Sequence, residues 1–139
     1  LSAQFDLAPV LERKAGKLSG GWQRRLSIAM ALISEPRILF LDEPTLGLDV
    51  LARSDLWDII RSLKGKITII LTTHYMEEAE ALSDRIAIMK DGQLLICDTA
   101  EEIKKTSPFL TGTKLRCSII SPLRALSESS SGERSLFRP

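Results

Sequence analysis

The sequence predicts an α/β fold with parallel central strands and flanking helices. Two short apolar runs, Arg37–Leu41 and Lys66–Thr72, have the length and apolar character of buried strands. Stretches with apolar residues at helical spacing lie before and after each run, and such alternation of helix and strand is typical of a parallel sheet. An Asp91-Gly92 pair between two further apolar runs predicts a C-terminal β-hairpin.

The first part of the chain is predicted to be helical. A short helix is expected within Leu7–Lys14, with Gly16 ending it. Over Trp22–Ile33 the apolar residues recur at helical spacing, Ser19 occupies the place of an N-cap, and Pro36 prevents continuation of the helix.

Helices are also predicted after each of the two strands. The first covers about Val50–Leu63 with Gly65 as its stop, and a shorter helix lies near Met76–Leu82. The hairpin is expected to pair Arg85–Met89 with Leu94–Cys97. A last helix completes the predicted order of helix, strand, helix, strand, helix, hairpin and helix.

The chain is predicted to change character after this last helix. Thr99 and Glu102 form a capping box for a helix that ends near Lys105. Residues 107–139 contain eight serines and show no clear periodicity. We therefore predict one folded domain over residues 1–106 and a serine-rich, flexible tail over residues 107–139.

The composition excludes several classes of protein. A net charge of +1 gives no basic field, so no nucleic-acid partner is expected. No apolar run approaches the ~18–20 residues that span a bilayer. The two cysteines, Cys97 and Cys117, have neither metal-site spacing nor that of a disulfide framework, which favours a reducing compartment. The first residue, Leu1, favours a fragment of a longer protein.

Two carboxylates, Asp42 and Glu43, follow the first apolar run. The carboxyl ends of strands in an open α/β sheet are where ligands bind. Asp42 is placed to hold Mg²⁺, directly or through its water shell, and Glu43 to orient or deprotonate an attacking water. Taken alone, the pair is also explained by an acidic turn that Pro44 ends.

His74 and the Ser19-Gly20-Gly21 turn are further candidates for contact with a ligand. His74 follows the second strand and so belongs to the same sheet edge, where an imidazole can bond a terminal phosphate and an attacking water. The Ser19 hydroxyl and the N–H groups that begin the next helix form a candidate anion site. A structural histidine and a flexible glycine turn are the alternative explanations.

The order and spacing of these motifs resemble the ATP-binding subunit of ABC transporters over about residues 15–105. The matching segments are the LSGG signature Leu18–Gly21, the Walker B strand Ile38–Glu43, the D-loop Leu46–Asp49, the switch histidine His74, and the strand and hairpin Asp84–Gly92. The stretch His74–Glu80 is similar to the multidrug and polyketide-export branch of this family. The resemblance implies the C-terminal part of a P-loop NTPase fold of the ABC ATPase type.

The resemblance also implies ATP and Mg²⁺ as ligands and ATP hydrolysis as the activity. Glu43 would be the general base or water-orienting acid, Asp42 the acid linked to Mg²⁺, and His74 the contact to the γ-phosphate. These roles make Glu43 and His74 the expected catalytic residues.

A dimer is implied as well, with a second, identical or different, ATP-binding subunit. Ser19, Gly20 and Gly21 would close over the ATP held by that subunit, and Asp49 would couple the two active sites. Trp22 departs from the family, which most often carries Gln there. A transmembrane permease would be the other partner, and it would hold the chain at the cytoplasmic face of a membrane and use the hydrolysis for export.

One family motif is missing from the sequence. No G-x-x-x-x-G-K-[ST] segment, the Walker A loop that cradles the phosphates, occurs in the 139 residues. We therefore expect the isolated chain to bind ATP poorly and to hydrolyse almost none. The missing strand of that motif is also expected to uncover Arg37–Leu41, which predicts poor solubility of the isolated chain.

Two other functions stay open. The first is that of a truncated, non-catalytic chain that only pairs with intact subunits. The second is that of a soluble ATPase of the DNA-repair or chromosome-maintenance type. Against the second, the sequence shows neither a heptad stretch nor a basic face.

Overall fold

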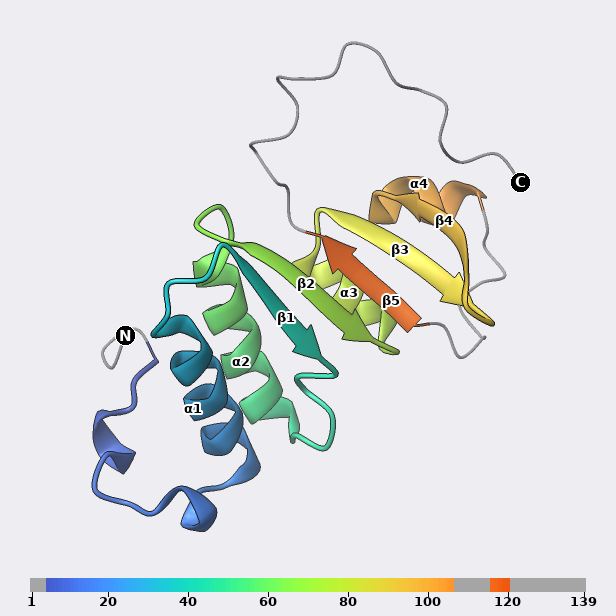
Figure 1. The fold of residues 1–139 in the computed structure, drawn as a ribbon. Coiled ribbons are helices and arrows are strands. Elements are labelled where there is room, and N and C mark those ends of the chain that lie inside the picture. Colours follow the sequence, from blue (N-terminus) through green and yellow to red (C-terminus); the bar gives the residue numbers. More distant parts are fainter. Residues whose placement is uncertain (1–4, 107–115, 121–139) are drawn as a thin grey trace.

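The described part of the chain forms one five-stranded sheet with helices packed against it (Figure 1). The computed structural model describes residues 5–106 and 116–120. Two short 3-10 helices, Ala8–Val10 and Ala15–Lys17, precede the main elements. The main elements, in chain order, are α1 Gly20–Leu32, β1 Ile38–Asp42, α2 Val50–Leu63, β2 Thr68–Thr73, α3 Met76–Leu82, β3 Arg85–Lys90, β4 Gln93–Asp98, α4 Ala100–Thr106 and β5 Arg116–Ile120.

The predicted α/β fold is confirmed, with a parallel β1–β2 pair and a β3–β4 hairpin. The strand order is β1-β2-β5-β3-β4. β1 and β2 are parallel, and their register pairs Asp42 with Thr72 at the carboxyl ends of both strands. The turn between β3 and β4 has φ of 51° at Asp91 and 79° at Gly92. Positive φ at both central residues is the geometry that an Asp-Gly hairpin favours.

The predicted flexible tail is wrong for Arg116–Ile120, which form β5. This strand lies between β2 and β3 and is antiparallel to both. A five-residue strand inserted between two others is stabilised by backbone pairing on both sides, and that pairing has no local sequence signal. The remaining residues of the predicted tail, 107–115 and 121–139, lie outside the described part of the chain.

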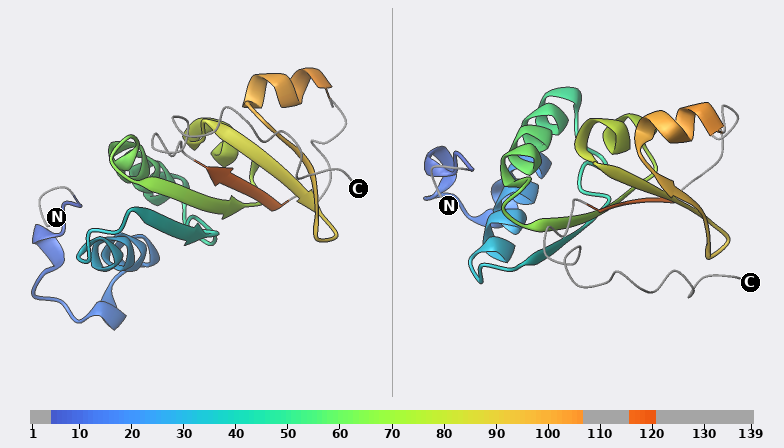
Figure 2. Two further views of the ribbon diagram at one scale, coloured as in Figure 1. Left: turned by 45° about the horizontal axis from the view of Figure 1, so that its top comes forward. Right: turned by 90° about the horizontal axis from the view of Figure 1, so that it is seen from above.

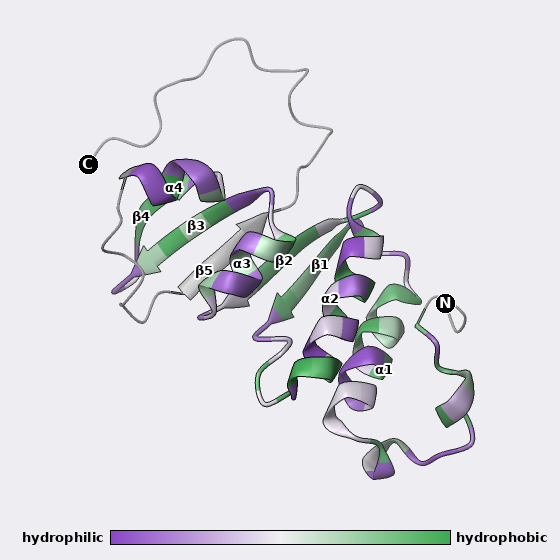
Figure 3. Ribbon diagram, turned by 180° about the vertical axis from the view of Figure 1, so that it is seen from behind, coloured by the Kyte–Doolittle hydropathy of each residue, from purple (hydrophilic) through white to green (hydrophobic). Residues whose placement is uncertain are grey.

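The helices that follow the strands cover one face of the sheet. Figure 2 shows α2, α3 and α4 on the same side, with α1 packed alongside α2. Seen from behind, β1, β3 and much of β2 and β4 are green and α4 is mostly purple, as expected for a core between the sheet and one helical layer (Figure 3). The most deeply buried aliphatic side chains of this core are Leu56, Ile60, Leu71, Ile86, Ile88 and Ile103. No helix among residues 5–106 and 116–120 is long and apolar enough to cross a membrane.

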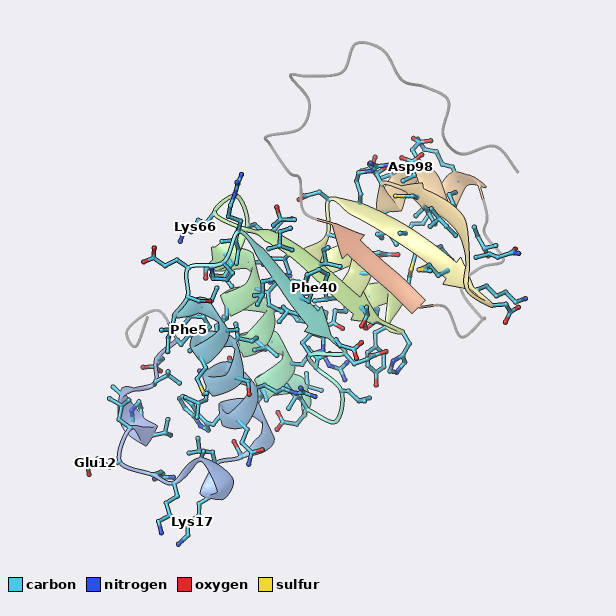
Figure 4. The ribbon with its side chains drawn as sticks, viewed as in Figure 1. Phe5, Glu12, Lys17, Phe40, Lys66 and Asp98 are labelled. Atoms are coloured by element: carbon cyan, nitrogen blue, oxygen red, sulfur yellow. The ribbon has the colours of Figure 1, made fainter. Side chains whose placement is uncertain are left out.

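β1 and β2 differ in how far they are buried. β2 is mostly buried along its length, as predicted for a central strand. β1 lies at the edge of the sheet and alternates exposed and buried residues, so it is less buried than the buried type of strand that its apolar run predicts. Phe40, labelled in Figure 4, is 71% exposed, and Ile38 is 42% exposed. This apolar edge agrees with the expected uncovering of β1, while the poor solubility stays a prediction.

Local signals account for most helix boundaries. Asp49 occupies the N-cap of α2, and its carboxylate accepts a hydrogen bond of 2.9 Å from the backbone N–H of Ala52. Gly65 follows this helix with φ of 78°, which glycine adopts without strain. The helix expected within Leu7–Lys14 is wrong, because only the single 3-10 turn of Ala8–Val10 forms there. Short helices need tertiary packing, and Val10 is the one residue of this turn that is buried.

Candidate active site at the carboxyl ends of β1 and β2

β1 and β2 end side by side, as the arrowheads in Figure 1 show, and this edge assembles the predicted acidic site. The hydroxyl of Thr72 donates a short hydrogen bond to a carboxylate oxygen of Asp42. The backbone N–H of Glu43 donates to the carbonyl of Thr72 at 3.0 Å. The two strand ends are therefore joined by hydrogen bonds that continue past the last paired residues of the sheet.

Glu43 stands in a strained backbone conformation. Its φ is 44°, in the left-handed region that residues with a side chain seldom adopt, and Pro44 follows it. Such strain costs of order 1–3 kcal/mol, and it gathers at functional sites where the surrounding structure enforces it. Here the carbonyl and hydroxyl of Thr72 both accept from the Glu43 N–H, which fixes the turn that aims the side chain.

His74 contacts Glu43 directly. Its Nδ1 lies 2.9 Å from each carboxylate oxygen of Glu43. Because a carboxylate accepts and does not donate, the N–H of this contact is on Nδ1. The opposite ring nitrogen, Nε2, is thereby left on the far side of the ring from Glu43. The His74 side chain is 41% exposed and that of Glu43 is 25% exposed, so both are open to a ligand from solvent.

The oxygen donors at this edge fit Mg²⁺. Asp42 is exposed and offers a carboxylate, with the Thr72 hydroxyl beside it. Mg²⁺ prefers oxygen ligands, keeps several waters, and is usually held by one or two carboxylates together with substrate phosphates. Within residues 5–106 and 116–120 no group of three or more His, Cys, Asp or Glu side chains is placed to hold a metal by itself. Asp42 and Thr72 would leave the other ligand positions of a bound Mg²⁺ to water or to a bound substrate.

The signature residues form a second group on a different part of the surface. Ser19 occupies the N-cap of α1 as predicted, but its side chain makes no capping hydrogen bond. The N–H groups of the first helical turn have no intrahelical partner, so the start of α1 is suited to an anion. Ser19, Gly21 and Asp49 line one surface cavity of about 240 Å³, which we call the signature cavity. Its other lining residues are Trp22, Arg25, Leu51, Ala52 and Asp55.

The packing of α1 requires a glycine at only one of the two signature positions, Gly20 and Gly21. A Cβ added to Gly21 would lie 3.0 Å from the Cβ of Ala52, so α1 and α2 approach too closely there for a larger residue. A Cβ added to Gly20 would meet the Cδ2 of Leu48 at 3.4 Å, an ordinary contact. Packing therefore explains Gly21, and it does not explain Gly20.

The structure thus sorts the predicted site residues into two groups. Asp42, Glu43 and His74 are brought together at the sheet edge by hydrogen bonds. Ser19, Gly21 and Asp49 share the signature cavity, with Gly20 next to them at the first position of α1. In the part of the chain that the structure describes, no hydrogen bond or ion pair joins one group to the other.

Sequence reasoning missed two polar residues near the histidine, Thr72 and Glu78. Thr72 joins Asp42 to Glu43, and its signal was the pair of threonines that ends the second apolar run. Glu78 is fully buried, although its position in an acidic stretch suggests a solvated helix face. The signal that could have revealed it is its spacing from Leu82, which puts the two side chains on the same face of α3.

Comparison with known proteins places these motifs in one family. The sequence model of the family described as ABC transporter matches residues 1–46. The chain is 50% identical over 112 residues to ABC transporter A family member 11 of Arabidopsis thaliana, which covers 81% of this chain and 12% of that protein. It is 48% identical over 105 residues to the daunorubicin resistance ATP-binding protein DrrA3 of Streptomyces coeruleorubidus, covering 75% of this chain and 33% of that protein.

Solved structures give the same result. The chain is similar to an ATP-binding cassette of an ABC transporter, with a TM-score of 0.68 and 30% identity. A nucleotide-free ATP-binding cassette from an ABC transporter matches with a TM-score of 0.70 and 29% identity. Each match covers 75% of this chain and 42% of the solved chain. The chain therefore spans less than half of these relatives, and it belongs to the ABC transporter family as part of an ATP-binding cassette.

Proposed function

We propose that this chain supplies the hydrolytic side chains of an ABC ATPase that drives transport across a membrane. The observation that carries the proposal is the 2.9 Å contact between His74 and Glu43 beside Asp42, at the edge where ligands of α/β sheets bind. A base, an orienting imidazole and a metal-linked acid are the groups that hydrolysis of a terminal phosphate requires.

In the proposed reaction a water molecule attacks the γ-phosphorus of ATP. Glu43 orients this water and accepts its proton as the new P–O bond forms, while the bond to the β,γ-bridging oxygen breaks and ADP leaves. His74 donates to the Glu43 carboxylate through Nδ1–H and, as the imidazolium that carries a proton on both nitrogens, to the γ-phosphate through Nε2–H, so one ring makes both contacts. Asp42 would hold Mg²⁺, which when bound neutralises charge on the β- and γ-phosphates.

The signature cavity is proposed to act on a different ATP molecule, one held by a second ATP-binding subunit. The start of α1 offers Ser19 and free N–H groups to its phosphates, and Asp49 at the cavity wall would couple the two sites. Without a Walker A loop in its sequence, this chain alone is expected to bind ATP poorly and to hydrolyse almost none.

The transport direction is proposed to be export. The support is the daunorubicin resistance relative, whose name links an ATP-binding protein to drug resistance, together with the export-like segment His74–Glu80. The partners would be a transmembrane permease and a second ATP-binding subunit, and the chain would then lie at the cytoplasmic face of the membrane.

The decisive variant is Glu43→Gln in a chain that joins this segment to the rest of an ATP-binding cassette. Losing a positioned general base lowers turnover by about 10²–10⁴-fold, and we expect a loss in this range for steady-state ATP hydrolysis. Nucleotide binding, measured by equilibrium titration, should be retained because the substitution keeps the shape of the side chain.

The matched control is Glu77→Gln, which makes the same change at an exposed carboxylate three residues after His74. Turnover of this control should equal that of the parent. If Glu43→Gln also turned over ATP at the parent rate, Glu43 would not be the base and the proposed role would be wrong.

A further inference from the structure

We propose that two contacts between α2 and α3 position His74 against Glu43 for hydrolysis. We call these contacts the α2–α3 brace, and the residues that form it are Arg53, Trp57, Tyr75 and Glu78. The inference rests on the proposed function, because it assigns positioning residues to the same hydrolytic site.

The first contact of the brace joins Arg53 to Tyr75, whose ring also packs against the ring of His74. The guanidinium carbon of Arg53 lies 4.9 Å from the centre of the Tyr75 ring, within cation–π range. The Tyr75 ring in turn lies 4.0 Å from the His74 ring, tilted by 39°. A continuous series of contacts therefore runs from α2 through Tyr75 to the imidazole that holds Glu43.

The second contact fixes the short helix that follows the histidine. The indole N–H of Trp57 donates to a carboxylate oxygen of Glu78 at 3.1 Å. α3 has only seven residues, and its N-cap residue Tyr75 makes no side-chain capping bond. The helix that continues from His74 is therefore held by this bond, by the 2.7 Å ion pair of Glu80 with Lys104 and by packing, rather than by a cap of its own.

The chemistry of Glu78 favours a positioning role over a purely stabilising one. Its side chain is fully buried, and its second carboxylate oxygen has no hydrogen-bond partner within residues 5–106 and 116–120. The Nε of Arg53 is likewise buried without a partner there. Buried polar groups that are only partly satisfied cost stability, and apolar residues of similar volume are often as stable or more so. A directional hydrogen bond at fixed geometry is what such a group provides instead.

The brace also connects the histidine to the signature cavity. Arg53 and Trp57 are four residues apart on α2, so they share one face of that helix. The same helix begins at Asp49, whose carboxylate caps it and lines the cavity. A movement of the Asp49 turn that rotated or shifted α2 would be transmitted to His74 through both contacts.

The test uses a chain that holds this segment with the rest of the cassette, and it compares Glu78→Met with Glu77→Met. The first removes the buried acceptor, and the second makes the same change at the exposed neighbour. Misplacing a catalytic group by a fraction of an ångström is expected to lower kcat by about tenfold for Glu78→Met. The KM for ATP should change by less than about twofold, because the brace does not touch nucleotide.

A double variant separates positioning from stability. Trp57→Phe with Glu78→Met removes donor and acceptor together, so neither side of that hydrogen bond is left buried and unpaired, and the midpoint of thermal unfolding should return toward that of the parent. We expect kcat to stay low in this double variant. Trp57→Phe alone keeps an aromatic ring in place and repeats the kcat measurement should Glu78→Met not fold.

A second cycle tests whether the brace acts through the histidine. On a His74→Ala background, Glu78→Met should lower kcat no further, because the group it positions is gone. The brace is overturned if kcat of Glu78→Met equals that of Glu77→Met, if kcat recovers together with stability in the double variant, or if the loss is undiminished on the His74→Ala background. Failure of the proposed function is a separate result, seen as parent-like turnover of Glu43→Gln.

Discussion

Asp42, Glu43 and His74 lie at the carboxyl ends of β1 and β2, a region that we call the hydrolytic edge after its proposed role. This edge and the signature cavity differ in how completely their polar groups are hydrogen-bonded within the chain. At the edge, Asp42, Glu43 and His74 are each fixed by hydrogen bonds to one another or to Thr72. At the cavity, the Ser19 side chain makes no capping bond, and the first turn of α1 presents unpaired N–H groups. The polar groups of the hydrolytic edge are therefore paired within the chain, whereas those of the signature cavity are left available to a ligand.

The energetics of the two regions follow the same division. The edge holds strain, since Glu43 has a positive φ, and surrounding hydrogen bonds enforce it. The cavity holds no backbone strain at Ser19, whose φ of −64° and ψ of 160° are ordinary extended values. Strain prepares a geometry for chemistry, whereas an unstrained, unpaired helix start is suited to receiving an anion. Under the proposed function, the comparison therefore separates a catalytic region from a binding region within residues 19–74.

The largest expected effect tests the comparison at Gly20, where a substitution should lower turnover without lowering stability. An added Cβ fits beside Leu48, so Gly20→Ala should leave the unfolding midpoint unchanged. If the backbone at Gly20 must approach a phosphate, the new methyl group misplaces it, and turnover should fall by about tenfold or more. Steady-state hydrolysis and thermal unfolding of the joined cassette measure the two quantities.

The control for this variant is Gly21→Ala, which the structure predicts to be destabilising because the new Cβ would meet Ala52 at 3.0 Å. Parent-like turnover of Gly20→Ala would show that no ligand approaches this backbone. The glycine pair would then be only a close helix contact at Gly21 and a tolerant turn at Gly20.

The sequence predicted that Asp42, Glu43 and His74 share one edge of the sheet, because strand ends set their positions. Asp42 and His74 each follow an apolar run, and parallel strands bring their carboxyl ends to one edge. The positions of α2 and α3 were predicted for similar reasons, since apolar periodicity and a capping Asp49 are local signals. What local patterns could not give was the direct contact of His74 with Glu43, because two side-chain rotamers 31 residues apart decide it.

β5 and the hydrogen-bond partner of Glu78 depend on contacts between segments distant in sequence. β5 exists because its backbone pairs with β2 and β3, and the intervening segments decide whether that pairing is reached. Glu78 is buried because Trp57, on another helix, supplies a hydrogen-bond donor. Propensity and periodicity describe one segment at a time, so contacts between segments override them at both places.

A smaller effect is expected at Asp49, which caps α2 and also lines the signature cavity. Replacing a capping Asp by Ala costs about 1 kcal/mol, whereas Asn caps nearly as well. We expect Asp49→Ala to lower the free energy of unfolding by that amount in denaturant titrations, and Asp49→Asn to leave it near the parent value. Asp49→Asn removes the negative charge and keeps the cap, so a fall in turnover for this variant would assign Asp49 to the binding region. If Asp49→Ala were as stable as the parent, Asp49 would not stabilise α2 as its N-cap.

The smallest expected effect concerns the ion pair that joins the walls of the cavity. An Arg25 guanidinium nitrogen lies 2.5 Å from a carboxylate oxygen of Asp55, and this ion pair joins α1 to α2. The guanidinium carbon of Arg25 also lies 4.6 Å from the centre of the Trp22 ring. The Asp55 side chain is 57% exposed, so water and salt screen the pair and Asp55→Asn should cost about 0.2–1 kcal/mol. The loss should shrink further in high salt when unfolding is followed by denaturant titration. A salt-independent loss several times larger would mean that the cavity wall is held as rigidly as the hydrolytic edge, and the division between the two regions would fail.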